Sequence, residues 1–125
     1  MILDTNAISA FADDMPAAVK RIGLANQIFI PVVVLGEFLY GIAHSNKRKD
    51  YETWIQRLRS GCELLNITGT TADSYAQIQS ELRRSGKPIP SNDTWIAALA
   101  REHNLDVMSR DTHFDRVAGL RRISW

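Results

Sequence analysis

Short apolar runs alternate with longer amphipathic stretches along the whole chain. The apolar runs predict β-strands at residues 2–3, 28–30, 63–67, 106–109 and 120–125. Between them, stretches with helical periodicity predict helices at residues 7–12, 17–24, 33–44, 51–61, 69–87 and 93–103. In the third of these, the core-facing stripe is expected to comprise Leu35, Phe38, Leu39 and Ile42. Because strands alternate with helices, we expect an α/β fold with a parallel sheet and helices on both faces.

The composition is that of an ordinary globular protein. Fifteen Lys and Arg residues against fourteen Asp and Glu residues leave a formal charge of +1, which indicates no particular partner. We expect a single domain over residues 1–125. The one cysteine, Cys62, excludes an internal disulfide and is expected to be a small buried or half-buried residue. A strand at residue 2 and the lack of a long apolar run predict a cytoplasmic protein.

Four acidic residues occupy positions that a parallel sheet would bring together. Asp4 and Asp111 come directly after apolar strands, Glu37 lies near the start of the helix after the second strand, and Asp93 follows the stiff segment 88–90 at the start of a buried helix. The carboxyl ends of parallel strands lie along one edge of a sheet, so all four acids are expected at that edge. The simpler alternative is that Asp4 caps a helix and that Glu37 complements a helix dipole.

Four carboxylates at one edge would repel one another unless a cation balanced their charge. Mg²⁺ or Mn²⁺ prefers such oxygen ligands, and the chain has no Cys/His set at zinc spacing. A metal site of this kind hydrolyses phosphodiester bonds by activating a bound water, without a histidine base. Short polar side chains beside the acids could support them, although each could equally be a cap or turn residue: Thr5, Asn6, Asn92 and Ser109.

The three histidines and the basic residues have weaker signals. His44 shares a helix face with Glu37 and is the best candidate for the edge of the site, whereas His103 is expected to interact with a helix end and His113 to serve in packing. Seven basic residues are candidate RNA phosphate contacts, with solvated surface as the simpler interpretation: Lys47, Arg48, Lys49, Arg83, Arg84, Lys87 and Arg110.

Four motifs, in order, resemble those of PIN-domain ribonucleases of the VapC toxin type. They are Leu3-Asp4-Thr5-Asn6, the segment 31–42 around Glu37, the segment 89–98 around Asp93, and the segment 109–114 around Asp111. The resemblance covers essentially the whole chain and implies a Rossmann-like, five-stranded parallel sheet. It also implies a metal site of Asp4, Glu37, Asp93 and Asp111, supported by Thr5 or Asn6, with Asp115 as a further acid.

The same resemblance implies a function. Proteins of this type are Mg²⁺- or Mn²⁺-dependent endoribonucleases that cut structured RNA, including tRNA and rRNA. They are typically homodimers, and a cognate VapB-type antitoxin inhibits them.

Other functional classes remain as alternatives with less support. A non-catalytic PIN-like module that binds RNA or protein would be expected to have lost one or more of the acids, and all four are present. A phosphatase with Asp4 as nucleophile would need a second Asp where Asn6 stands. A phosphorylated receiver domain would need an acid at the end of the third strand, where the chain has residues 66–68, Asn-Ile-Thr.

Overall fold

The computed structural model describes all 125 residues and contains one parallel sheet of five strands in the order β3-β2-β1-β4-β5. The strands are β1 (Ile2–Leu3), β2 (Phe29–Pro31), β3 (Glu63–Leu65), β4 (Val107–Met108) and β5 (Arg122–Ile123). Every neighbouring pair is parallel, and β1 in the centre pairs with β2 and β4. The predicted five-stranded parallel α/β fold is confirmed, although β3, β4 and β5 are shorter than the sequence pattern indicated.

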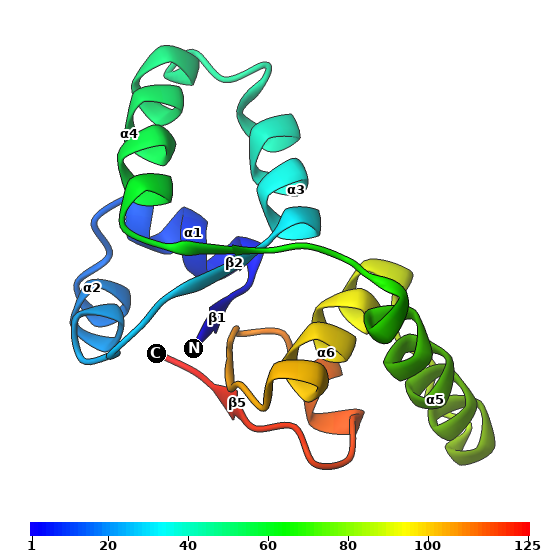
Figure 1. The fold of residues 1–125 in the computed structure, drawn as a ribbon. Helices are drawn as coiled ribbons and strands as arrows, with labels where there is room; N and C mark the ends of the chain where they lie inside the picture. Colours follow the sequence, from blue (N-terminus) through cyan, green and yellow to red (C-terminus); the bar gives the residue numbers. More distant parts are fainter.

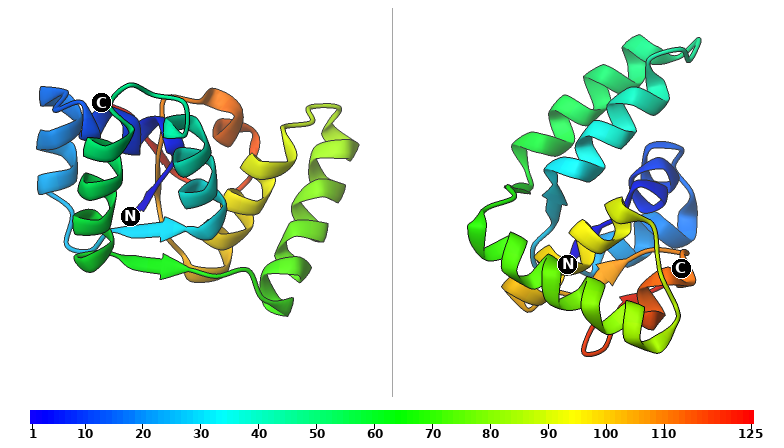
Figure 2. Two further views of the ribbon diagram at one scale, coloured as in Figure 1. Left: turned by 90° about the horizontal axis from the view of Figure 1, so that it is seen from above. Right: turned by 90° about the vertical axis from the view of Figure 1, so that its right-hand side faces the viewer.

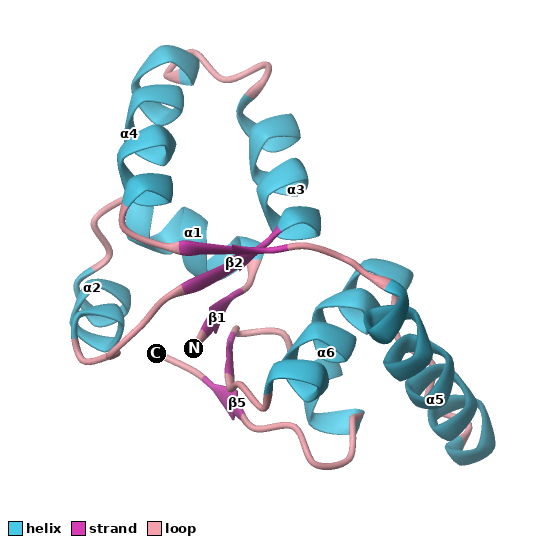
Figure 3. Ribbon diagram, viewed as in Figure 1, coloured by secondary structure: helices cyan, strands magenta, loops and turns pink.

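Six α-helices connect the strands. They are α1 (Thr5–Ala12), α2 (Pro16–Gly23), α3 (Val32–Ile42), α4 (Arg48–Ser60), α5 (Gly69–Ser85) and α6 (Ser91–His103). Figure 3 distinguishes helices from strands by colour. Five of the six helices begin one to three residues earlier than predicted, and α5 begins at the predicted residue. The α4 helix begins within the basic segment 47–49, and α6 begins at Ser91 because the fixed extended backbone of Pro90 ends the preceding loop at its N-cap position. A short 3₁₀ helix, η1 (Thr112–Arg116), was not predicted.

The helices form two groups on opposite sides of the sheet. Figures 1 and 2 show α1 to α4 gathered on one side and the α5–α6 pair on the other. The strand order requires this arrangement, because the chain moves from β1 through β2 to β3 at one edge and must then return to β4 on the far side of β1. Right-handed crossovers in opposite directions place their helices on opposite faces.

One hydrophobic cluster of 26 buried residues joins the sheet to both helix groups. Ile2 and Leu3 in β1 are completely buried, as expected for the central strand of a sheet covered on both faces. The buried character predicted for α6 is confirmed by its run of residues from Ile96 to Ala100. None of the helices combines the length and apolar character that crossing a bilayer requires.

The stripe predicted for α3 was partly wrong. Leu35, Phe38 and Ile42 are buried as expected, but the side chain of Leu39 is 36% exposed, and Val34 occupies the core instead. The helix is turned so that the row of Val34, Phe38 and Ile42 faces the core, because α1, α4 and α6 all contact it. Cys62 is half-buried, as predicted.

Candidate metal centre

Asp4 is both a helix cap and a member of a buried polar network. It follows β1 directly, and one carboxylate oxygen, Oδ1, accepts a hydrogen bond of 2.8 Å from the backbone N–H of Thr5. The other oxygen, Oδ2, accepts hydrogen bonds from Asn6 Nδ2 (3.0 Å) and Ser109 Oγ (2.7 Å). The two interpretations of Asp4 in the sequence, helix cap or site residue, are therefore compatible, because each uses a different oxygen.

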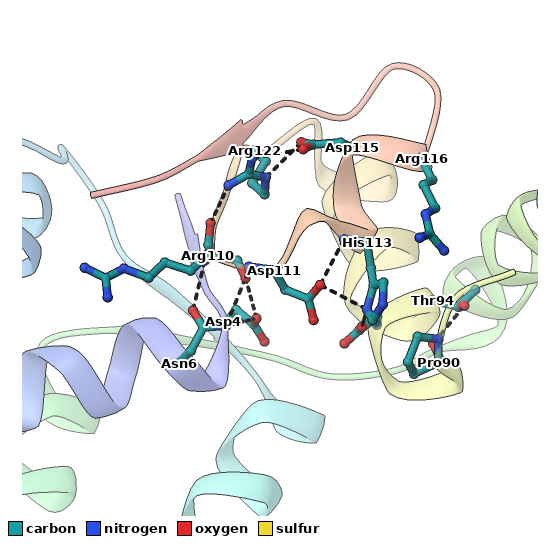
Figure 4. A network of polar contacts seen from close by, with 12 residues as sticks. Asp4, Asn6, Pro90, Thr94, Arg110, Asp111, His113, Asp115, Arg116 and Arg122 are labelled. Carbon is teal, nitrogen blue, oxygen red and sulfur yellow. Dashed lines mark hydrogen bonds and ion pairs between the residues drawn. The ribbon is translucent and has the colours of Figure 1, made fainter. Parts of the chain in front are cut away.

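Ser109 is the residue that joins the ends of β1 and β4. Its hydroxyl is completely buried, donates to Asp4 and accepts hydrogen bonds from Asn6 Nδ2 (3.1 Å) and from the backbone N–H of Asp111 (2.9 Å). The Asn6 amide oxygen in turn accepts from the backbone N–H of Arg110 at 3.2 Å. These bonds cross between strands that are about a hundred residues apart in sequence, and Figure 4 shows the resulting network. They fix Asp4 close to Asp111.

Asp93 and Asp111 both approach the same nitrogen atom of the His113 ring. Asp93 lies in the first turn of α6, and Asp111 caps η1 by accepting a 2.9 Å hydrogen bond from the backbone N–H of His113. The Nδ1 atom of His113 lies 2.9 Å from Asp93 Oδ2 and 3.0 Å from Asp111 Oδ1. Figure 4 shows His113 beside Asp111. The three side chains place one potential ligand atom each within 4.8 Å of the others, a geometry that suits a metal ion.

The packing role predicted for His113 was therefore wrong, and the ring belongs to the acidic group. The η1 turn is the reason: it folds the chain back at Asp111, so that a residue two positions later lies over the same carboxylate. The Asp111-x-His113 spacing beside a strand end was the signal in the sequence. His44 is exposed and does not line either pocket beside Glu37. His103 also lies outside these pockets, 3.8 Å from Glu102.

A cleft of about 510 Å³ brings Glu37 into the same group. All four predicted acids line this cleft: Asp4, Glu37, Asp93 and Asp111. Glu37 Oε1 and Thr5 Oγ1 are buried at its wall, and neither atom has a hydrogen-bond partner. Buried polar atoms without partners are costly, so these two oxygens favour an additional polar or cationic occupant. The residues thus fit a divalent ion held mainly by oxygen atoms.

The electrostatics of the cleft lead to the same conclusion. Burial raises the pKa of Asp4, and the nearby charges of Asp93 and Asp111 raise it further. Burial likewise raises the pKa of Glu37, with added repulsion from Asp4 and Asp93, and burial with repulsion from Asp111 raises the pKa of Asp93. Hydrogen bonds from Ser109 and Thr5 to Asp4, and the one between His113 and Asp93, offset part of the increases at these two aspartates. A bound cation would remove the repulsion that the three shifts share.

Two of the predicted supporting residues lie outside this group. The side chain of Asn92 is exposed at the start of α6 and makes no hydrogen bond that supports an acid. Asp115 is turned away by η1 and forms a two-pronged ion pair with Arg122, at 2.8 and 2.9 Å. Of the seven basic candidates, Arg110 alone lines the acidic cleft. Lys47, Arg48 and Lys49 lie at the start of α4, and Arg83, Arg84 and Lys87 lie around the end of α5.

The fold and the acidic site together define a class of protein. Residues 1–120 match the PIN domain family, and the chain belongs to that family. It is related to VapC toxins of VapBC toxin-antitoxin systems. One such relative, the tRNA(fMet)-specific endonuclease VapC of Shigella flexneri, is 32% identical over 99% of this chain and 96% of its own length. Toxin FitB of Neisseria gonorrhoeae is 29% identical over 90% of this chain and 88% of its own length.

Solved structures agree with this relationship. VapBC2 from Rickettsia felis, bound to a DNA fragment from its promoter, superposes with a TM-score of 0.89 at 25% identity, covering 99% of this chain and 97% of that chain. The DNA-bound VapBC from Salmonella typhimurium gives a TM-score of 0.87 at 28% identity, covering 99% of this chain and 96% of that chain.

Proposed function

We propose that this chain is a metal-dependent endoribonuclease that hydrolyses phosphodiester bonds of structured RNA. The observation that carries the proposal is the convergence of Asp4, Glu37, Asp93 and Asp111 on one cleft, although they come from four separate elements. Relatives of similar length are named as ribonucleases, which supports the same activity. The retention of all four acids favours catalysis over a non-catalytic RNA- or protein-binding role.

Asp4, Glu37, Asp93 and Asp111 are the residues that would hold the ion, and Mg²⁺ or Mn²⁺ suits a set of ligands dominated by carboxylate oxygens. When bound, a divalent ion supplies water activation and neutralises charge that develops on the phosphodiester oxygens. His113 provides a nitrogen atom beside Asp93 and Asp111 and so holds these two carboxylates together. Ser109 and Asn6 orient Asp4 through hydrogen bonds, and Thr5 presents a buried hydroxyl beside Glu37.

The relatives also support a cellular context for the activity. Related structures are described as complexes of VapBC, and two of them contain DNA. We therefore propose that the chain is the toxin of a VapBC-type pair in the cytoplasm, inhibited by a cognate VapB-type antitoxin and active as a single-domain protein that forms a homodimer. One relative is named as a tRNA(fMet)-specific endonuclease, so tRNA is the first substrate class to test, with rRNA second.

The experiment compares RNA cleavage by the wild type, by Asp93→Asn and by a matched control, Asp73→Asn. Asp73 is exposed on α5 and makes no ion pair, so its substitution removes one carboxylate charge away from the cleft. Each protein is incubated with bulk tRNA or rRNA in Mg²⁺, in Mn²⁺ and in chelator, and the products are resolved on a denaturing gel.

We expect discrete fragments with the wild type and Asp73→Asn in metal, and none in chelator or with Asp93→Asn. A folded wild-type protein that binds metal but leaves every RNA intact would contradict the nuclease and favour the binding module. Cleavage that persists in Asp93→Asn would remove Asp93 from the metal site.

A further inference from the structure

Arg110 is the single Lys or Arg side chain in a cleft that five carboxylate residues line. It follows Ser109 at the end of β4, and the hydrogen bond from its backbone N–H to Asn6 Oδ1 fixes its Cα beside the acidic group. Figure 4 shows that its side chain then extends away from Asp4 and Asp111. The guanidinium group therefore lies at the side of the cleft, next to the acids but apart from them.

Aromatic and sulfur contacts hold the guanidinium group there. Its central carbon lies 4.7 Å from the centre of the Trp125 ring, a cation–π distance. One terminal nitrogen, Nη2, lies 3.5 Å from Met15 Sδ and 3.5 Å from the main-chain oxygen of Trp125. The Trp125 indole N–H donates to the same Met15 sulfur at 3.4 Å, which links the indole to the other side of the cleft. Arg110, Trp125 and Met15 thus form a small clamp.

The clamp holds the charge of Arg110 apart from the acidic side chains of the cleft. Arg48, Arg101 and Arg122 each form an ion pair with an Asp or Glu side chain at 2.7 to 2.9 Å, whereas Arg110 forms none with these side chains, despite the acids nearby. Its Nε and Nη1 donors make no hydrogen bond within the protein, so part of the planar fork is free. Such a fork matches the geometry of a phosphate group.

We infer that Arg110, held by Trp125 and Met15, binds a backbone phosphate of the RNA next to the one that is cleaved. The inference rests on the proposed ribonuclease function and assigns one substrate contact within it. The phosphates of an RNA strand that enters the cleft are repelled by the carboxylates there. Arg110 places a positive charge in the same cleft, where it can attract a phosphate. The clamp keeps the guanidinium from folding onto the acids, where it would occupy the metal site instead.

A phosphate contact has a specific signature in the salt dependence of binding. Each neutralised phosphate contributes roughly 0.7 to 0.9 to the slope of log K against log salt concentration. Loss of one contact should therefore reduce the magnitude of the slope by about that amount. The protein with the contact should therefore bind RNA more tightly than a variant without it, and the ratio of the two binding constants should fall by about threefold between about 50 and 200 mM salt. Contacts that only stabilise the fold would leave this slope unchanged.

The experiment measures binding of fluorescently labelled bulk tRNA by anisotropy, over a range of salt concentrations, in Mg²⁺. All proteins carry Asp93→Asn, which we expect to leave the RNA intact, and a gel confirms that it does. The test variant is Arg110→Gln, and the matched control is Arg21→Gln. Arg21 is exposed on α2 and lines a separate pocket with Met1, Asp106 and Arg121 at the opposite edge of the sheet. Trp125→Leu tests the clamp, because it leaves the charge of Arg110 in place.

We expect Arg110→Gln to weaken tRNA binding several-fold at low salt and to reduce the slope, whereas Arg21→Gln changes neither. Trp125→Leu should weaken binding and reduce the slope by less than Arg110→Gln does, because the charge of Arg110 persists but is no longer held at the phosphate. An unchanged slope in Arg110→Gln would overturn the inference, and a lowered Tm with that unchanged slope would identify the clamp as packing only. If the active wild type cuts no RNA, the proposed function fails separately from this binding result.

Discussion

Replacing Ser109 with alanine removes the one side chain that connects Asp4, Asn6 and Asp111. The hydroxyl is completely buried and takes part in three hydrogen bonds, with partners at 2.7, 2.9 and 3.1 Å. Alanine fits the same backbone and leaves nearly the same volume, so the substitution isolates the hydroxyl. We expect Ser109→Ala to lower the free energy of unfolding and to loosen the acidic site.

The expected decrease in the free energy of unfolding can be worked out from the hydrogen-bond partners of the Ser109 hydroxyl. A hydrogen bond to an ionised carboxylate such as Asp4 contributes about 2 kcal/mol, and a partly buried backbone N–H left without its acceptor, here that of Asp111, costs about 1 kcal/mol more. Asn6 Nδ2 keeps its second bond, to Asp4 Oδ2, so its loss is small. The total is about 3 kcal/mol. For a domain of this length, that corresponds to a decrease in Tm of about 10 °C.

The loss should also depend on pH. The hydrogen bond from Ser109 lowers the pKa of Asp4 and so opposes the stronger effect of burial, which raises it. Without the hydroxyl, the pKa of Asp4 in the folded protein rises further. When the pKa of a carboxyl group is higher in the folded than in the unfolded protein, the folded protein keeps its full stability below about pH 4, the pKa in the unfolded chain. It loses stability as the pH rises through the pKa of the folded protein. The difference in Tm between wild type and Ser109→Ala should therefore be larger near pH 7 than near pH 4.

Thermal unfolding followed by circular dichroism, in chelator, measures both effects. Ser80→Ala is the matched control, because Ser80 is exposed on α5, makes no hydrogen bond through its side chain and should change Tm by no more than about 2 °C. A Tm of Ser109→Ala equal to that of Ser80→Ala would refute the reasoning. It would mean that the network around Asp4 contributes nothing to stability.

Two further predictions concern the metal and the charge of the site. Adding Mg²⁺ or Mn²⁺ to chelated protein should raise Tm by about 10 °C at about a hundredfold excess over Kd, a gain of about 2.7 kcal/mol, and an unchanged Tm would count against a shared metal site. Burial and the charges of Asp4 and Asp93 raise the pKa of Glu37, so its ionised carboxylate destabilises the folded protein near neutral pH. Glu37→Gln removes this charge and should therefore raise Tm in chelator at that pH. That gain should fade as the pH falls towards about 4, where the carboxyl is protonated; a gain that does not vary with pH would exclude charge as its cause.

The order of elements and the positions of the four acids could be predicted from the sequence. Each apolar run marks a strand and each amphipathic stretch a helix, because burial of one face dictates the periodicity. In a parallel sheet, the residues that follow the strands lie at one edge whatever the details of packing, which is why Asp4 and Asp111 were expected to be close. The same rule placed Glu37 and Asp93, since the helices that carry them start from that edge.

The tertiary structure decided which of the remaining polar residues face the cleft. His113 lies between two carboxylates because η1 folds the chain back, and the same turn directs Asp115 towards Arg122. The clamp on Arg110 joins residues that are 95 and 15 positions away in sequence, Met15 and Trp125. Periodicity describes which face of an element is buried, but it contains no information about the rotamer or turn that aims one side chain at another. Those directions depend on contacts between distant segments, which exist only after the chain has folded.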